Sequence, residues 1–306
     1  MILLIVNFHY IREEKYSSGI YPISIQDLVR QIEVLSKNYQ FISQNKLLNI
    51  ISKKKIPDGK YCLLTFDDGL KEQMAAFDLL QSRGTPAIFY VPTNAIQYRE
   101  VLDVHKLHHI RSKINDNELF DLLDQKYKIS NFDFDVRSLD NQYRYDTEKA
   151  RKIKYFLNFI LDKDKKDEAI NYLFGSLVKD EQSFADEFYM DEIDLRTLSK
   201  SGALGSHGSA HIPLSKVSYE DAKDDIRQSV RYLEHLTHSP VYSFSYPYGG
   251  VDAVNEILRP AFTGTDIAFA LTMWRGINND ITDPYFLNRV DTNDAPGGKL
   301  NSNKYI

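Results

Sequence analysis

Residues 61–69, with the sequence YCLLTFDDG, carry the pattern that decides the fold. The apolar run at 61–66 is typical of a strand that is buried on both faces of a parallel sheet. Asp67 and Asp68 follow it directly, and Gly69 permits a sharp bend that lets both carboxylates point to one place. Adjacent carboxylates repel each other, and a nearby cation relieves both this repulsion and the cost of desolvation. The pair is therefore a candidate cation site, although a solvated acidic turn has the same Asp-Gly signature.

Similar apolar runs recur along the chain and alternate with amphipathic segments. Strands are predicted at 1–6, 87–91, 241–246, 267–272 and 286–290, and helices at 24–38, 71–83, 218–236 and 252–258. A short apolar stretch at 203–206 continues the alternation. Ser24 with Asp27, and Ser218 with Asp221, have the spacing of helix-capping pairs. Repeated strand-then-helix units predict an α/β fold with a parallel sheet and helices outside it. In such folds the active site forms at the carboxyl ends of the strands.

The alternation is interrupted between about residues 95 and 200, where strand signals fade and helical stretches such as 147–161 and 166–177 dominate. We expect a helical insertion, a lid or cap within a single domain of residues 1–306. The region contains His105, His108 and His109, and two of these histidines are four residues apart, as on one face of a helix. We favour a structural or substrate-contacting role for them over a second metal site, because no clear third ligand precedes them.

Composition and charge exclude several classes of protein. The chain has 306 residues, 42% of them hydrophobic, which is enough for a sizeable core, and its net charge of −5 argues against nucleic acid as the main partner. Cys62 is the single cysteine, so no intrachain disulfide can form, and we expect a buried, unreactive side chain. The run at 1–6 lacks the features of a signal peptide, and no run approaches the roughly 18 apolar residues of a membrane span. We expect a cytoplasmic protein, and the sequence indicates no oligomeric state.

A pair of histidines supplies the second part of a metal site. His207 and His211 lie in the segment GSHGSAH at 205–211, after a short apolar stretch. Their spacing brings both imidazoles to one side of a single turn. Two neutral imidazoles and one carboxylate form a set that leaves metal positions open for water and substrate. Alone, the pair is also consistent with two ordinary loop histidines, but together with the aspartate pair it predicts a metal site.

Three segments resemble the motifs of a known enzyme family. TFDDG at 65–69 and SHGSAH at 206–211 are similar to the first two motifs of the polysaccharide deacetylases, which form carbohydrate esterase family 4, the NodB-homology domain. FSYPYG at 244–249 resembles the third motif. The resemblance covers about residues 1–94 and 201–295. It implies a distorted (β/α)7-type barrel and one divalent metal ion, with zinc the first choice and cobalt, nickel or iron as alternatives.

The resemblance also implies roles for individual residues. Asp68, His207 and His211 would be the metal ligands. Asp67 would be the general base that activates water. The backbone N–H of Tyr248 would help to bind the oxyanion of the tetrahedral intermediate. These roles together imply that the enzyme removes an acetyl group from a sugar by hydrolysis.

Two positions depart from the usual pattern. Ser245 stands where most members of the family have an arginine that orients the base, and Arg289 is the candidate replacement from another strand. A surface or structural arginine is the alternative. The late strand lacks the usual acid histidine, whereas His9 follows the first strand. This order resembles the circularly permuted branch of the family, similar to the poly-N-acetylglucosamine deacetylases of biofilm systems, and makes His9 the candidate general acid; its alternative is a structural histidine.

The combined reading is a metal-dependent hydrolase that removes N-acetyl groups from a sugar. The expected substrate is an acetylated sugar, nucleotide- or lipid-linked, that is an intracellular precursor of a surface polysaccharide. Alternatives are an O-deacetylase or another amide hydrolase on the same site, and a catalytically silent carbohydrate-binding relative. Trp274, the only tryptophan, follows a predicted strand at the catalytic rim, where it could stack on a sugar or serve in packing.

Overall fold

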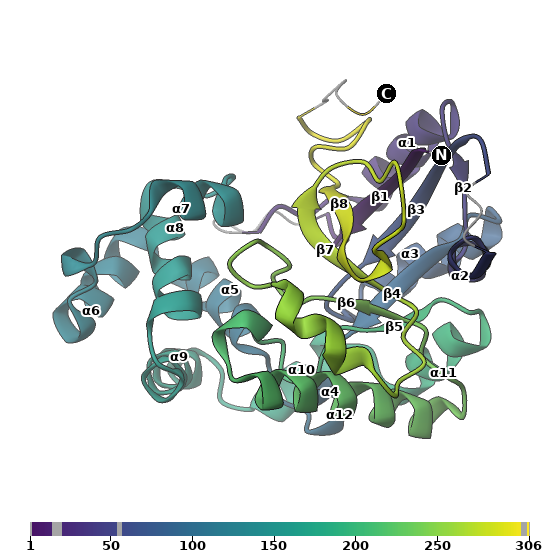
Figure 1. Cartoon of the computed structure of the whole chain (residues 1–306). Coiled ribbons are helices and arrows are strands. Elements are labelled where there is room, and N and C mark those ends of the chain that lie inside the picture. The colour runs from purple at the N-terminus through teal and green to yellow at the C-terminus, as the bar shows by residue number, and fades with distance from the viewer. Residues whose placement is uncertain (1, 14–19, 54–56, 301–304, 306) are drawn as a thin grey trace.

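The computed structural model describes residues 2–13, 20–53, 57–300 and 305, so Met1, the first residue of the first predicted strand, lies outside the described residues (Figure 1). Within them, seven parallel strands close into a barrel. These strands are β1 (Ile2–Phe8), β3 (Lys60–Phe66), β4 (Ala87–Val91), β5 (Leu204–Ser206), β6 (Ser243–Ser245), β7 (Phe269–Arg275) and β8 (Leu287–Asp291). Their order is β1-β8-β7-β6-β5-β4-β3, and β3 pairs back with β1. The predicted α/β barrel of the (β/α)7 type is confirmed.

Alternation along the strands separates the two faces of the barrel. Residues two apart on each strand point inward and fill the interior. The strand residues of this inner cluster are Leu3, Ile5, Tyr61, Leu63, Ile88, Tyr90, Phe269, Leu271 and Leu287. The residues between them pack against the helices, and Cys62 is one of them, buried as predicted. The short strand β2 (Gln40–Phe41) pairs in parallel with the first half of β3, at Tyr61 and Cys62.

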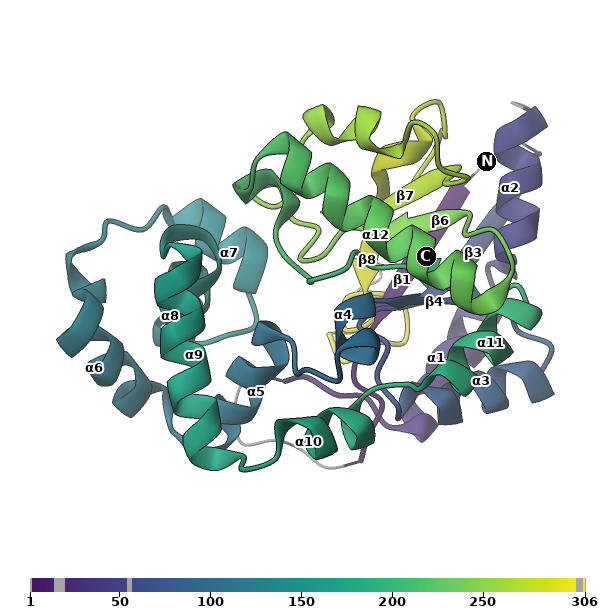
Figure 2. The same ribbon diagram turned by 90° about the horizontal axis from the view of Figure 1, so that it is seen from below.

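Helices α1 (Ile25–Ser36), α3 (Gln73–Ser82) and α12 (Tyr219–Thr237) cover the outside of the barrel (Figures 1 and 2). Helix α2 (Gln44–Lys53) instead contributes Leu47 and Ile50 to the inner cluster. Ser24 and Asp27 form the predicted capping box. The Ser218 hydroxyl accepts the Asp221 N–H at 3.1 Å. Helix α3 begins two residues later than predicted, and the Lys71 N–H before it donates to the carbonyl of residue 188 at 2.9 Å.

The predicted helix at 252–258 is wrong. The N–H groups of Ala253 and Val254 both donate to the Gly250 carbonyl and close a turn there. A 3₁₀ helix follows at Glu256–Phe262 (η4). Pro260 has no N–H and disfavours a regular α-helix in this segment, so the tighter helix forms instead.

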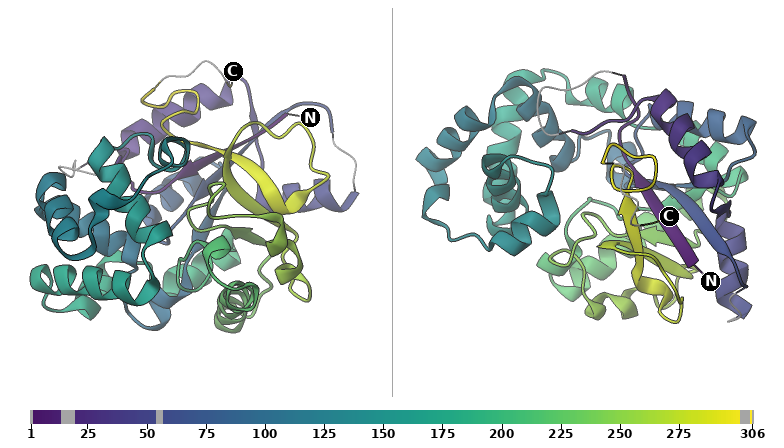
Figure 3. Two further views of the ribbon diagram at one scale, coloured as in Figure 1. Left: turned by 60° about the vertical axis from the view of Figure 1, so that its left-hand side comes forward. Right: turned by 90° about the horizontal axis from the view of Figure 1, so that it is seen from above.

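The chain between β4 and β5 is helical, and most of it gathers on one side of the barrel (Figures 1 and 3). Its helices are α4 (Thr93–Gln97), α5 (Asp103–Lys113), α6 (Asp116–Tyr127), α7 (Val136–Tyr143), α8 (Glu148–Tyr155), α9 (Lys163–Leu177), α10 (Glu181–Phe188) and α11 (Glu192–Lys200). We call residues 93–200 the helical region. Much of it packs around a hydrophobic cluster of its own, which includes Ile110, Ile153 and Phe174. Its description as an insertion within one domain stays a prediction. Among the described residues, no helix is both long and apolar enough to span a membrane.

Candidate metal centre

The loop after β3 presents Asp67 and Asp68 at the carboxyl end of the barrel. The Asp67 N–H donates to the Phe8 carbonyl at 3.0 Å, which ties this loop to the end of β1. Gln73 is fully buried, and its Nε2 donates to the carbonyls of His9 (2.8 Å) and Asp67 (2.6 Å). The segments that carry the candidate acid and the candidate base are therefore held against each other.

Gly69 is required at its position for two reasons. Its φ of +60° lies in the left-handed region, which L side chains rarely adopt. A Cβ there would also stand 2.9 Å from Cγ1 of Val91. The bend predicted from the sequence is thus present, and it turns Asp68, itself at φ +79°, into the site.

The turn that carries the two histidines is held by hydrogen bonds to a carboxylate from α12. The His207 N–H donates to the Val91 carbonyl at 3.0 Å. Asp225, which is buried, accepts the N–H groups of Ser209 (2.9 Å) and Ala210 (2.8 Å), both between the histidines. Sequence reasoning missed Asp225. The available signal was an aspartate within the apolar stripe of the helix predicted at 218–236, where an unpaired charge is costly.

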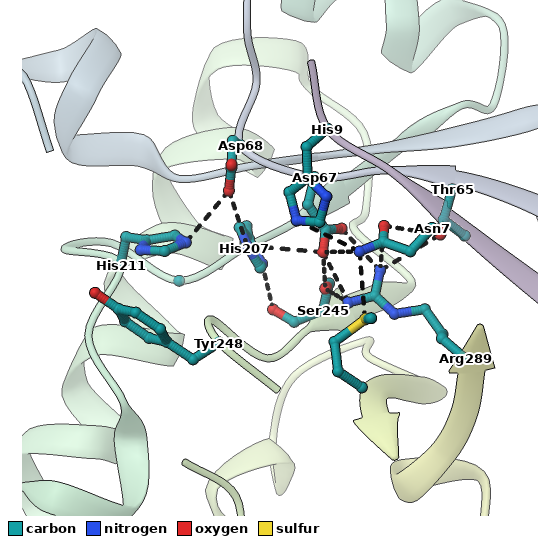
Figure 4. Close-up of polar contacts among 12 residues, drawn as sticks. Asn7, His9, Thr65, Asp67, Asp68, His207, His211, Ser245, Tyr248 and Arg289 are labelled. Atoms are coloured by element: carbon teal, nitrogen blue, oxygen red, sulfur yellow. Dashed lines mark hydrogen bonds and ion pairs between the residues drawn. The ribbon is translucent and has the colours of Figure 1, made fainter. Parts of the chain in front are cut away.

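Asp68, His207 and His211 converge on one point (Figure 4). All three are buried, and their ligand atoms lie within 4.8 Å of one another. Nε2 of His207 is 3.4 Å, and Nε2 of His211 3.2 Å, from Oδ1 of Asp68. The structure therefore brings together the three residues that were predicted to bind metal.

The protonation pattern of this cluster fits a bound cation. Nδ1 of His207 lies 2.6 Å from the carbonyl oxygen of Ser245, which only accepts hydrogen bonds, so this nitrogen carries a proton. In the neutral imidazole, Nε2 then presents a lone pair to the Asp68 carboxylate. Two acceptors at this distance need a positive charge between them. The set of one carboxylate and two imidazoles is one that divalent transition metals bind.

The residues of this cluster also have shifted pKa values. Burial would raise the pKa of Asp68, but the neighbouring imidazoles of His105, His207 and His211 outweigh it and hold that pKa well below its usual range. For His207, the loss of solvation is outweighed by Asp67 and Asp68, which raise its pKa. Burial lowers the pKa of His211 to about 4, which keeps it neutral, as a metal ligand must be.

Arg289 holds the candidate base Asp67 from β8, which pairs with β1 as β3 does. The Arg289 side chain is completely buried on β8, and its Nη1 and Nη2 donate to the two carboxylate oxygens at 2.9 and 2.7 Å. Nη2 also donates to the Ser245 hydroxyl at 2.8 Å (Figure 4). Burial would raise the pKa of Asp67, and the Arg289 charge outweighs it and lowers this pKa. A surface position for Arg289 is excluded.

Asn7 completes this network and was missed from the sequence. It is fully buried on β1, where its Oδ1 accepts from Nη1 of Arg289 at 2.9 Å and its Nδ2 donates to Oδ2 of Asp67 at 3.2 Å. Parallel pairing of β1 with β3 sets Asn7 beside Thr65 and brings it to the base. A polar residue within the apolar run that opens the chain was the signal.

His9 and Tyr248 line the same cavity as the aspartates and the histidine pair, a space of about 250 Å³. His9 is partly exposed, with Nε2 3.5 Å from Nδ2 of Asn7. The Tyr248 ring lies 5.1 Å from that of His211, and its hydroxyl donates to Oδ1 of Asn158 at 3.1 Å. Both residues thus line the site, and their roles stay predictions.

The histidines of α5 point in different directions. His105 reaches the site, with Nε2 3.2 Å from Oδ2 of Asp68. His109 instead packs edge-on against Phe174 and Phe184. His108 lines the cavity, and its Nδ1 is 2.8 Å from the Tyr10 hydroxyl. The pair four residues apart therefore does not share a metal.

Trp274 serves in packing. Its ring stacks on that of Phe286 with centroids 5.6 Å apart, and Phe286 belongs to the main hydrophobic cluster. Trp274 is not among the residues that line the cavity. Of the two readings of this residue, stacking on a sugar and packing, the structure supports packing.

Comparisons with known proteins agree with this site. A family model described as polysaccharide deacetylase matches residues 145–259, which include the second and third motifs. No match is found among curated protein sequences. Together with the barrel and its motifs, the family match supports the resemblance to the polysaccharide deacetylases. This match supports hydrolysis of acetyl groups on a carbohydrate.

Solved structures share the fold over almost the whole chain. The Streptococcus pyogenes deacetylase PplD in complex with acetate has a TM-score of 0.60 and 14% identity, covering 99% of this chain and 98% of that one. IcaB from Ammonifex degensii has a TM-score of 0.59 and 14% identity, with 98% and 95% covered. A de-N-acetylase from Aggregatibacter actinomycetemcomitans has a TM-score of 0.56 and 13% identity, with 95% and 94% covered. At these identities the likeness is one of fold.

Proposed function

We propose that this chain is a metal-dependent hydrolase that removes an N-acetyl group from a sugar. One observation carries the proposal. A carboxylate fixed by an arginine, Asp67, stands beside a buried cluster of metal-binding type, Asp68 with two histidines, in one cavity. Oδ2 of Asp67 lies 3.9 Å from Nε2 of His207, so a base and a metal site are adjacent, as hydrolysis of an amide requires.

The ligands in this proposal are Asp68, His207 and His211, and zinc is the proposed metal. A divalent ion held by them would supply Lewis acidity for the acetyl carbonyl and lower the pKa of the attacking water. Asp67 accepts the proton that this water loses. Arg289 keeps Asp67 ionised and fixes its orientation, which is the part that an arginine in the third motif would otherwise play.

Two further groups complete the proposed chemistry. The Tyr248 N–H makes no hydrogen bond within the described residues, so it is available to the oxygen that becomes negative as water attacks. An amine leaves poorly as an anion, and its nitrogen needs a proton from a general acid. We assign this role to His9, which is partly exposed and lines the cavity. A histidine after β1 also supports placing the chain in the circularly permuted branch.

The walls of the cavity support a sugar as substrate. Aromatic rings with a hydroxyl both stack on sugar faces and form hydrogen bonds with sugar hydroxyls. The cavity is lined by Tyr10, Tyr21, Tyr143, Tyr145, Tyr246 and Tyr248. We propose a nucleotide- or lipid-linked acetylated sugar, a precursor of a surface polysaccharide, as the first substrate class to test.

Acetate release together with metal analysis tests the proposal. Purified protein, loaded with zinc, is incubated with N-acetylated and O-acetylated sugars in free, nucleotide-linked and lipid-linked forms. We expect one metal ion per chain, and acetate with a free amine from an N-acetylated sugar. Acetate from O-acetyl esters alone would establish the O-deacetylase alternative. Metal binding without any acetate release would favour a silent carbohydrate-binding protein, and protein that binds no divalent ion would contradict the metal site.

A further inference from the structure

His105 contacts the metal-binding carboxylate from outside the barrel. It lies in the first turn of α5, with 1% of its surface exposed. Its Nε2 is 3.2 Å from Oδ2 of Asp68, whereas His207 and His211 face Oδ1 of the same carboxylate. The two oxygens of Asp68 thus have different partners.

The contacts of His105 define which nitrogen carries its proton. A carboxylate only accepts hydrogen bonds, so Nε2 of His105 donates to Asp68. Nδ1 of the neutral ring is then an acceptor, and the Tyr189 hydroxyl at 2.6 Å donates to it. The same hydroxyl accepts the Leu102 N–H at 3.1 Å. A chain of hydrogen bonds therefore runs from the backbone before α5 through Tyr189 and His105 to Asp68.

Tyr189 reaches this position because its segment pairs with the aspartate loop. The Met190 N–H donates to the Gly69 carbonyl, and the Lys71 N–H donates to the carbonyl of residue 188, both at 2.9 Å. Leu70 and Tyr189 form an antiparallel bridge. His105 and Tyr189 are 84 residues apart and come from opposite ends of the helical region. Both ends of the helical region therefore contact the loop that carries Asp68.

We propose that His105, oriented by Tyr189, is a positioning residue that fixes the Asp68 carboxylate through Oδ2 and leaves Oδ1 to the metal. The inference rests on the proposed metal centre. Among the described residues, the ligand atoms of Asp68, His207 and His211 all lie within 4.8 Å of one another. His105 is not part of this metal-binding group. Hydrogen bonds to a ligand residue fix its orientation, and their loss typically costs about 10–100-fold in metal affinity.

This role makes the helical region part of the metal site. Asp68 sits at φ +79°, where a residue other than glycine is strained, so its backbone alone does not favour the orientation that the site needs. The contact from His105 supplies the missing restraint. We therefore expect zinc affinity to depend on a residue that neither belongs to a deacetylase motif nor binds the metal.

Three substitutions at two positions of α5 test the role of His105. His105→Leu removes the N–H donor at similar volume, and His105→Gln keeps a donor close to the position of Nε2. His109→Gln, on the same helix but directed away from the site, is the matched control. Zinc affinity is measured by competition with a chelator, and the visible absorption of the cobalt-loaded protein reports on the geometry of the ligands.

We expect His105→Leu to bind zinc about 10–100-fold more weakly and to alter the cobalt spectrum. His105→Gln should recover most of the affinity, and His109→Gln should match the unsubstituted protein. Unchanged affinity and spectrum in His105→Leu would overturn the proposal. If His105→Leu does not fold, Tyr189→Phe decides: it leaves Nδ1 without its donor, so weaker zinc binding supports the role and unchanged binding refutes it. If the unsubstituted protein binds no zinc or cobalt, the metal centre itself is wrong, which separates the two failures.

Discussion

Replacing Arg289 by methionine tests how strongly the buried ion pair stabilises the barrel. The guanidinium is fully buried and donates to both oxygens of Asp67, to Asn7, to Ser245 and to the Thr272 carbonyl. Methionine fills much of its volume but leaves the Asp67 carboxylate buried without its cation. Breaking such a pair typically costs about 3–5 kcal/mol. At roughly 2 °C per kcal/mol for a chain of this size, the melting temperature should fall by about 6–10 °C.

The assay is thermal and urea unfolding of the metal-free protein, followed by circular dichroism. Asp67→Asn combined with Arg289→Met is the control, because it removes both charges and should recover a large part of the loss. If Arg289→Met lowers the free energy of unfolding by less than about 1 kcal/mol, the reasoning is refuted, because a solvated or loosely held ion pair contributes no more than that. A double variant no more stable than Arg289→Met would show that lost packing, and not an uncompensated charge, is the cause.

Four further predictions separate chemistry, metal binding and folding. Asp67→Asn should keep one metal ion per chain and lower acetate release by about 10²–10⁴-fold, because it removes the base; normal turnover measured by acetate release would disprove the assignment. His207→Ala should lose bound zinc in metal analysis, and full zinc content would show that it is no ligand. Gly69→Ala should destabilise more than Gly84→Ala in urea unfolding, because both glycines have positive φ (+60° and +63°) but only Gly69 lacks room for a Cβ; equal losses would contradict this. Asp225→Ala leaves two buried N–H groups without an acceptor, so we expect a loss of about 2–4 kcal/mol in unfolding and weaker zinc binding by chelator competition, against no change if the turn holds by itself.

The barrel and most of the site were within reach of the sequence because both depend on local patterns. Each strand of the barrel corresponds to an apolar run, and parallel strands place their carboxyl ends on one rim. Residues that follow different strands, such as Asp68 and His207, must therefore meet there. Arg289 could be predicted as a partner of Asp67 for the same reason. The third motif lacks the arginine that orients the base, and a residue on another strand of the barrel can reach the same rim and take its place.

Contacts made by distant segments were beyond the same reasoning. His105 reaches Asp68 only because the helical region folds back on the aspartate loop, and no spacing along the chain reports this. Asp225 was taken as one more residue of an amphipathic helix, although its burial makes it the acceptor for the histidine turn. The segment after Gly249 was predicted as a helix from its composition, and the turn at Gly250 prevents it.

Three residues of the site, Asp68, His211 and Tyr248, adopt left-handed backbone angles of +79°, +52° and +62°. They make up half of the residues other than glycine that do so in the described chain. Glycine would relieve the strain at each position, but a carboxylate, an imidazole and an aromatic ring are needed there. Engineering for thermal tolerance therefore has little to gain on these loops. Improvement must come from the barrel and its outer helices, which can stiffen the molecule while the strained backbone at the rim keeps its shape.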